Sequence, residues 1–171
     1  MADYNNYGRN QGGRGNQGGN GRQGGRPQAP TGPTKTDELL KFFNNGLRKD
    51  GKLRPEVVMT QASNMANLIA ESRETRSQLR AFFSECKGIQ YKMTDEQSFE
   101  NHAQDIWMLK AKSAYKYRNG ARDGKIKEPL YKLINAGVDY VSKENTYESF
   151  QDFMKFFEAV VGYSYNTGIA E

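Results

Sequence analysis

Apolar residues recur at helical spacing through most of the chain. Between positions 130 and 141 they fall at i, i+3, i+4, i+7, i+8 and i+11, which is one face of an α-helix. A Phe-rich run over 150–161 has the same spacing, and shorter apolar stripes occupy 59–69 and 79–86. No segment shows the sustained alternation that is typical of a strand. The sequence therefore predicts an all-α fold, a compact bundle of five to six helices.

Polar residues mark where these helices begin and end. A short helix is expected from Thr36 to a stop at Gly46, followed by the loop RKDGK and a helix that begins near Pro55. Further helix starts are predicted from capping patterns at 75–78, 94–97 and 145–148. Gly88 is expected to end the helix that begins at 75–78.

The first 34 residues differ from the rest in composition. They hold ten of the 18 glycines, four arginines and almost no aliphatic side chain. Such a segment buries too little apolar surface to offset its ordering entropy, so residues 1–34 are expected to be a disordered basic tail before a bundle domain at 35–171. Its Gly–Arg spacings resemble RGG-type RNA-binding segments. A flexible solubilising linker is an equally open interpretation.

The sharpest charge feature is the stretch LKAKSAYKYRNGARDGKIK at 109–127. It holds seven basic residues against one acid, Asp123, while residues 139–171 carry six acids and two lysines. Solvated helix faces normally mix signs to gain i,i+4 pairs, so this excess favours an anionic partner over a merely solvated face. Tyr115 is a candidate for stacking on bases, whereas Tyr117 is expected to face the core.

A helical wheel separates the cations of this stretch. Lys112 and Lys116 lie on one flank of the expected core face, and Arg118 lies on the other. Lys110 falls near the middle of the apolar arc, so it either extends outward at the edge of the bundle or is held there for a function. Beyond Gly120, the charges of Arg122, Lys125 and Lys127 continue the run.

Catalytic chemistry finds little support in the sequence. The single histidine, His102, lacks the HxxxH, CxxC or ExxH spacings of metal sites, and Cys86 falls on an apolar stripe and is expected in the core. No cofactor is predicted. A lone cysteine and the lack of a long apolar run favour a cytoplasmic protein.

Three segments together resemble a known family. TRSQLRAFFSE at 75–85, LKAKSAYKYRNG at 109–120 and FQDFMKFFEAVVGYSY at 150–165 are similar, in this order, to the small subunits of type III-A CRISPR effector (Csm) complexes. The resemblance covers roughly residues 45–166. Ala111 stands where a proline is common in that family, which favours an unbroken helix, and the Gly-rich tail is not a general family feature.

The resemblance implies a non-catalytic helical subunit of an RNA-guided antiviral complex. Copies of such a subunit stack along the guide RNA–target RNA duplex, beside backbone subunits and a Cas10-like large subunit, and hold the RNA backbone without reading its sequence. The family-like positions that this implies for RNA contact are Arg76, Arg80, Lys110, Lys112, Lys116 and Arg118. Arg122 and Lys125 are added from charge alone.

Two other functions stay open. The first is a stand-alone, chaperone-like RNA-binding protein that acts through its tail. The second is a helical protein-interaction module without nucleic acid. An enzyme is the least supported class, because no constellation of residues suggests one.

Overall fold

Six α-helices, two short helical turns of other types and one small hairpin make up the described part of the chain. The computed structural model describes residues 32–118 and 124–170. The elements in chain order are α1 (Lys35–Leu40), the 3-10 helix η1 (Lys41–Asn45), β1 (Arg48–Lys49), β2 (Lys52–Leu53), the π-helical turn η2 (Val57–Gln61), α2 (Ala62–Glu71), α3 (Arg76–Gln90), α4 (Glu96–Tyr117), α5 (Glu128–Glu144) and α6 (Tyr147–Ser164). The predicted all-α bundle is confirmed.

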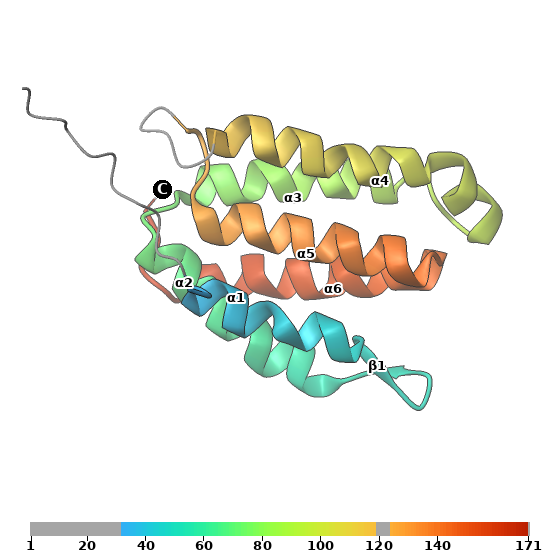
Figure 1. Cartoon of the computed structure of the whole chain (residues 1–171), viewed down its shortest axis with the longest axis horizontal. Coiled ribbons are helices and arrows are strands. Elements are labelled where there is room, and N and C mark those ends of the chain that lie inside the picture. Colours follow the sequence, from blue (N-terminus) through green and yellow to red (C-terminus); the bar gives the residue numbers. More distant parts are fainter. Residues whose placement is uncertain (1–31, 119–123, 171) are drawn as a thin grey trace, which may run out of the picture. The chain divides into compact units, whose positions relative to one another are not determined.

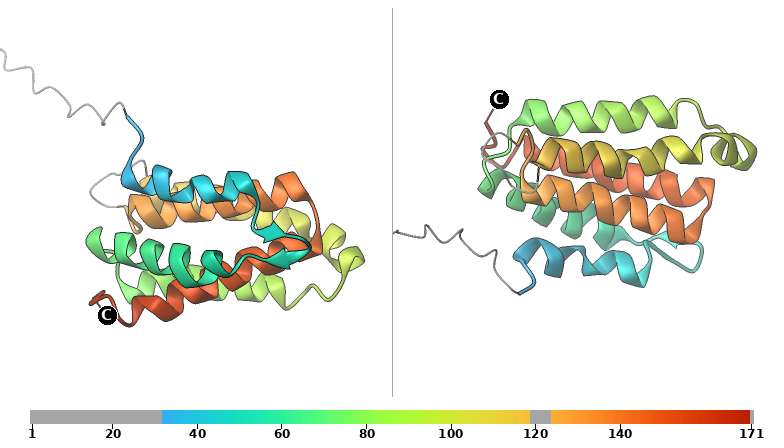
Figure 2. Two further views of the ribbon diagram at one scale, coloured as in Figure 1. Left: turned by 90° about the horizontal axis from the view of Figure 1, so that it is seen from below. Right: turned by 45° about the horizontal axis from the view of Figure 1, so that its top comes forward.

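The last four helices run side by side along the bundle (Figures 1 and 2). α6 packs against α2, α3 and α5, and α4 lies between α3 and α5. α1 and α2 cover the side away from α4. Because the helices alternate in direction, α3 begins, α4 ends and α5 begins at the same end of the bundle. That shared end brings together basic residues from three separate parts of the sequence.

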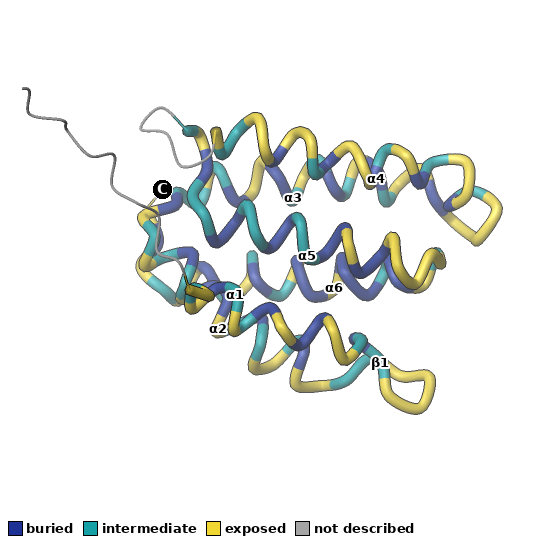
Figure 3. Tube along the Cα trace, in the orientation of Figure 1, coloured by how far each residue is buried: buried dark blue, intermediate teal, exposed yellow. Residues whose placement is uncertain are grey.

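Aromatic side chains of α6 fill the centre of the core. Phe150, Phe153, Phe156 and Phe157 are all fully buried, and buried residues recur along α6 in Figure 3. Gly137 of α5 permits this packing, because a Cβ there would lie 2.0 Å from Cε2 of Phe153. The aromatic ring of Phe153 thus packs against the glycine of the predicted apolar stripe.

The predicted helix ends are correct in part. Thr75 caps α3 with Gln78 as expected, and Gly46 ends the first helical segment with a φ of 70°. The start of α4 shifts by one residue to an Asp95–Ser98 capping box, and that of α6 shifts to Thr146–Ser149. The predicted stop at Gly88 is wrong, since α3 continues to Gln90. Glycine lowers helix propensity only modestly and does not by itself end a helix.

Two local features were absent from the sequence-based expectation. The segment expected as a loop after Gly46 is an antiparallel hairpin, with Lys49 paired to Lys52, and Arg48 anchors it to the buried carboxylate of Asp152 through Nη2 at 3.1 Å. The π-helical turn η2 shifts the phase of the following helix. Met59, expected on the apolar stripe, is therefore 66% exposed.

Of the tail predicted at 1–34, residues 1–31 lie outside the described residues, as does Arg122. Thr34, the last residue of the predicted tail, is the N-cap of α1.

Candidate nucleic-acid interface

Lysines of α4 contact acids of the neighbouring helices. Lys112 Nζ bonds Glu85 of α3, and Lys116 Nζ lies 3.9 Å from the same carboxylate. Lys116 also lies over the ring of Phe82, 4.3 Å from its centroid. Two lysines thus share one carboxylate. The local excess of positive charge is smaller in the folded chain than in the sequence.

Lys110 reaches the opposite neighbour of α4. Its Nζ lies 2.5 Å from Oδ1 of Asp139 on α5, and its side chain stays 42% exposed. This geometry fits the expectation that Lys110 extends outward at the bundle edge. It also brings the acidic C-terminal segment against the basic one, because α4 and α5 pack side by side. The two charged segments therefore meet at this ion pair.

The two tyrosines of the basic stretch occupy different environments. Tyr117 is half-buried and stacks on Tyr131, with ring centroids 4.4 Å apart and an interplanar angle of 13°. Burial raises the pKa of its hydroxyl. Tyr115 is 67% exposed, with the guanidinium of Arg118 5.5 Å from its centroid. Tyr117 is core-facing as predicted, and Tyr115 is accessible for stacking.

Hydrogen bonds fix the segment that leads into α5 against the ends of α3 and α4. The amide of Lys125 donates to the carbonyl of Lys116 at 2.7 Å, and the side chain of Gln78 donates to the carbonyl of Lys125. Arg76 N donates to Ala170 O at 2.7 Å and holds the C-terminal segment nearby. Segments distant in sequence are therefore joined at one end of the bundle.

Glu74 is a buried carboxylate within this junction. It is 1% exposed, and its Oε2 accepts the amide of Lys127 at 2.7 Å, where α5 has no side-chain cap of its own. Its Oε1 has no hydrogen-bond partner among the described residues. Burial raises the pKa of this carboxyl, and the bond from the Lys127 amide opposes that effect. Glu74 thus positions the start of α5.

Seven cations gather around this junction, and we call them the basic end. They lie in the turn before α3, in the first half of α3, at the end of α4 and in the segment before α5, and Figure 1 shows these helix ends together: Arg73, Arg76, Arg80, Lys116, Arg118, Lys125 and Lys127. Arg76 lies over Tyr165 at 4.6 Å from the ring centroid and donates to Ile169 O at 3.3 Å. By contrast, Arg73, Arg80 and Lys125 are exposed and have no acidic partner among the described residues.

The structure therefore groups the predicted residues unevenly. Arg76, Arg80, Lys116, Arg118 and Lys125 belong to the basic end, while Lys112 lies further along α4 beside Glu85 and Lys110 lies on the α5 side. Arg73 was missed by the sequence analysis. It lies in the turn between α2 and α3 with a φ of 60°, and an isolated arginine in a turn carries no periodic signal.

Two other potentially reactive side chains of the described chain, Cys86 and His102, have structural surroundings. Cys86 is fully buried, and burial raises the pKa of its thiol to about 12, so it is a core residue as predicted. His102 is half-exposed on α4 with its Nδ1 3.6 Å from Asp105, which also bonds Lys92. Within residues 32–118 and 124–170, no cluster of three or more metal-ligating side chains occurs.

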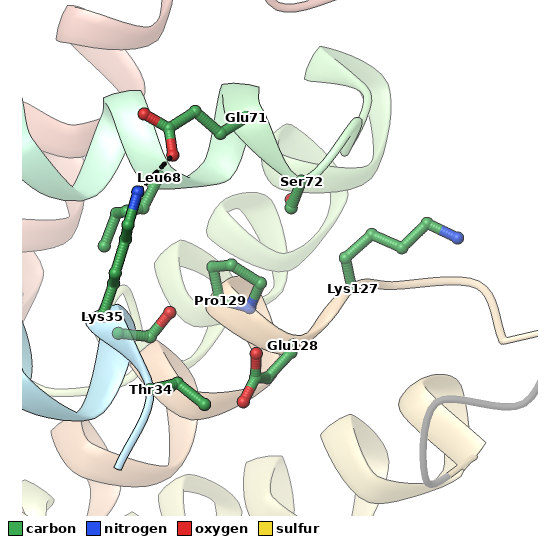
Figure 4. Close-up of a pocket in the computed structure, with 9 residues that line it drawn as sticks. Thr34, Lys35, Leu68, Glu71, Ser72, Lys127, Glu128 and Pro129 are labelled. Carbon is green, nitrogen blue, oxygen red and sulfur yellow. Dashed lines mark ion pairs between the residues drawn. The ribbon is translucent and has the colours of Figure 1, made fainter. Parts of the chain in front are cut away.

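An open hollow lies between the starts of α1 and α5 and the end of α2 (Figure 4). Lys35 and Glu71 face each other across it at 3.8 Å, and the side chain of Lys127 extends away from it. Its charges are thus paired or directed outward and do not converge on a common point. The hollow lacks the convergent polar groups of a small-molecule site.

Comparison with known proteins identifies the class of this helical bundle. The family model described as Csm2 Type III-A matches residues 52–167, which is 116 of the 171 residues. The chain therefore belongs to the Csm2 family, the structural small subunits of type III-A CRISPR effector (Csm) complexes, and the resemblance found in the sequence is confirmed. No curated protein and no solved structure matches the chain significantly. None of the described helices is long and apolar enough to span a membrane.

Proposed function

We propose that this chain is a non-catalytic small subunit that lies in several copies along the guide RNA–target RNA duplex and holds its backbone without reading its sequence. Its further partners are the backbone subunits and the Cas10-like large subunit of the complex, and it acts in the cytoplasm without a cofactor. Membership of the Csm2 family supports the assembly. The RNA contact rests on the basic end.

The observation that carries the proposal is the convergence of cations without acidic partners. Arg73, Arg80 and Lys125 come from three different segments and are exposed around one junction of the described bundle. Concentrated positive charge of this kind is stabilised when a polyanion approaches, because bound cations release the counterions of the phosphates. Lysine and arginine contacts to phosphates position the RNA and carry no sequence information.

The remaining predicted cations are expected to contribute to RNA binding to different degrees. Arg76, Lys116 and Arg118 lie at the same end and extend the surface. Lys112 contacts RNA by exchanging Glu85 for a phosphate, whereas any RNA contact of Lys110 requires it to leave Asp139. Arg122 follows Arg118 closely in the chain and is proposed on charge alone.

The surroundings of Cys86 and His102, the two side chains of the types most often used in nucleophilic catalysis, support the non-catalytic role. The thiol of Cys86 is buried, with a pKa of about 12, and is not available as a thiolate at neutral pH. His102 is engaged with Asp105, far along α4 from the basic end. In this proposal the cleavage of target RNA belongs to another subunit.

One observation favours a competing function. Lys110, Lys112 and Lys116 of the 109–127 stretch pair with acids of the described chain, as a protein-interaction bundle without RNA would allow. A third possibility is RNA binding by the Gly/Arg-rich tail alone. Deleting residues 1–34 separates this last function from ours, because the bundle retains RNA in our proposal and loses it in the other.

The test is a pull-down of the tagged full chain from its native host. Co-purifying proteins are identified, and bound RNA is sized on a gel. Short RNAs of uniform length, together with a Cas10-like large subunit and a repeated backbone subunit, are the expected result. Heterogeneous RNA without those subunits would favour the tail, and the same protein partners without RNA would favour a purely structural interaction module.

A further inference from the structure

The outward face of α4 carries an apolar surface that the bundle does not use. Trp107, Met108 and Tyr115 are 44%, 53% and 67% exposed, and they are three of the six large hydrophobic side chains that are exposed in the described chain. Ala111 and Ala114 lie exposed between them. We call these five residues the α4 apolar face. Figure 3 shows α4 along one edge of the bundle with its outer side exposed.

This surface is not a by-product of core packing. The opposite side of α4 already supplies the core with Phe99, Ala103, Ile106 and Leu109. A surface helix normally pairs one apolar face with a polar one, and α4 is apolar on both. Contiguous exposed apolar surface containing aromatic residues is typical of a protein interface.

Charges at the two ends of this surface differ in sign. Residues 100, 104, 107, 111 and 114 follow the 3.6-residue period and so lie in one line along α4, and Arg118, the C-cap of the helix with a φ of 48°, follows at its end. The line begins at Glu100, passes through Gln104, Trp107 and the two alanines, and ends at Arg118. Its spacing is symmetric about position 109. A second α4 laid antiparallel on this line places each acid against an arginine, whereas a parallel one places like charges together.

The flanks of the surface do not oppose such a contact. Lys112 on the α3 side bonds Glu85, and Lys110 on the α5 side bonds Asp139. The lysines nearest to the α4 apolar face are therefore partly neutralised within their own chain. This lowers the repulsion between two approaching copies.

We propose that the α4 apolar face binds the same face of a second copy, with the two α4 helices antiparallel. In this register Trp107 packs on Ala111 of the second copy, Gln104 lies opposite Ala114, and Glu100 lies opposite Arg118. The small alanine side chains leave room for the indole. Such a contact is isologous and closes after two copies, so it pairs the free subunit and does not build the row along RNA. The argument for it does not rest on the proposed RNA contact, although Arg118 belongs to both surfaces.

The chain supplies its own probe for this contact. Trp107 is its only tryptophan, so the emission of the full chain reports on this surface directly. We expect sedimentation equilibrium, without RNA, to show a monomer–dimer transition, and the emission to shift to the blue over the same concentrations. A single helix face is a small interface, so the transition is expected in the micromolar range or above.

Matched truncations test whether the tryptophan is the anchor. Trp107→Ala is expected to weaken association at least tenfold, because buried aromatic anchors carry most of the energy of an interface. Met59→Ala removes an apolar side chain that is even more exposed, at 66%, from outside the α4 apolar face and should leave association unchanged. An equal effect of the two variants, or a chain that stays monomeric at all concentrations, overturns the proposal.

The register is tested by charge exchange and by cross-linking. Glu100→Arg and Arg118→Glu should each weaken association about tenfold, and the double variant should restore it. A mixture of Gln104→Cys and Ala114→Cys chains should cross-link to each other faster than either does to itself, and the buried Cys86 does not compete. Self-linking of Gln104→Cys indicates a parallel pair, and blue-shifted emission only when RNA is added indicates an RNA surface. Either result overturns the proposal, and neither bears on the pull-down.

Discussion

The middle of α4 and the basic end both carry cations, but in surroundings of opposite kind. Lys110 and Lys112 each contact a carboxylate of a neighbouring helix. Arg80 and Lys125 are exposed without an acidic partner in the described chain. A run of basic residues in sequence is therefore two different surfaces in the fold. In the second surface, Arg73, Arg80 and Lys125 can meet a polyanion without first breaking an ion pair with an acid of the described chain.

The largest expected effect comes from reversing charge at the basic end. Arg80→Glu combined with Lys125→Glu should weaken RNA binding by about 100-fold or more, because repulsion replaces two charge-assisted hydrogen bonds to phosphate. The magnitude of the salt slope should fall by about one for each phosphate that the variant no longer neutralises. Fluorescence anisotropy with labelled RNAs of different sequence, over a range of salt concentrations, measures both.

The hairpin offers the matched control for this variant. Lys49 and Lys52 are exposed at the other end of the bundle, and Lys49→Glu with Lys52→Glu makes the same change in net charge. This control should change RNA affinity less than about threefold, since distant charges are screened at moderate salt. Equal reductions in both variants would mean that overall charge, and not the basic end, determines binding. Weaker binding to some sequences only would contradict backbone recognition.

Sequence reasoning predicted the helical fold well because each helix has its own local signal. The apolar period over 130–141 and the capping box at Thr75 require only neighbouring residues, and both are present in the structure. The hairpin was missed because two residues per strand are too few to show alternation. Met59 was misplaced because a π-helical turn changes the helix phase without any sequence signal that we recognised.

The surroundings of the predicted cations could not be obtained in the same way. Glu85 lies 27 residues from Lys112 in sequence, and Asp139 lies 29 residues from Lys110. A count of acids within the basic stretch finds neither of them. The packing of α4 between α3 and α5 decides which charges are neutralised. The sequence therefore identified most of the candidate cations but not which of them pair within the fold.

A smaller, opposite effect is expected from releasing the paired lysines. Glu85→Gln removes the carboxylate that Lys112 and Lys116 share. Both lysines are then available to phosphates, so RNA affinity should rise about threefold, with a slightly steeper salt dependence. Exposed ion pairs contribute only about 0–1 kcal/mol, so the free energy of unfolding should change little. Anisotropy and urea denaturation measure the two quantities.

Glu158→Gln is the control for this increase in affinity. It makes the same change in net charge but removes the acid that lies 3.9 Å from Lys87, on the α6 side of α3. RNA affinity should stay within experimental error of the unmodified chain. An increase as large as that of Glu85→Gln would attribute both to net charge alone, and no increase in either would place Lys112 and Lys116 outside the RNA-binding surface.

The smallest effect concerns Lys110, for which the sequence left two interpretations open. If it extends to the bundle edge only to meet Asp139, a double-mutant cycle with Lys110→Met and Asp139→Asn should give a coupling energy of about 1 kcal/mol or less, since both side chains are largely exposed. Urea denaturation of the four chains measures it. RNA affinity should then be unchanged in Lys110→Met and clearly reduced in Lys125→Met. Equal reductions in these two variants would instead show that Lys110 exchanges Asp139 for a phosphate, and the division between the middle of α4 and the basic end would not hold.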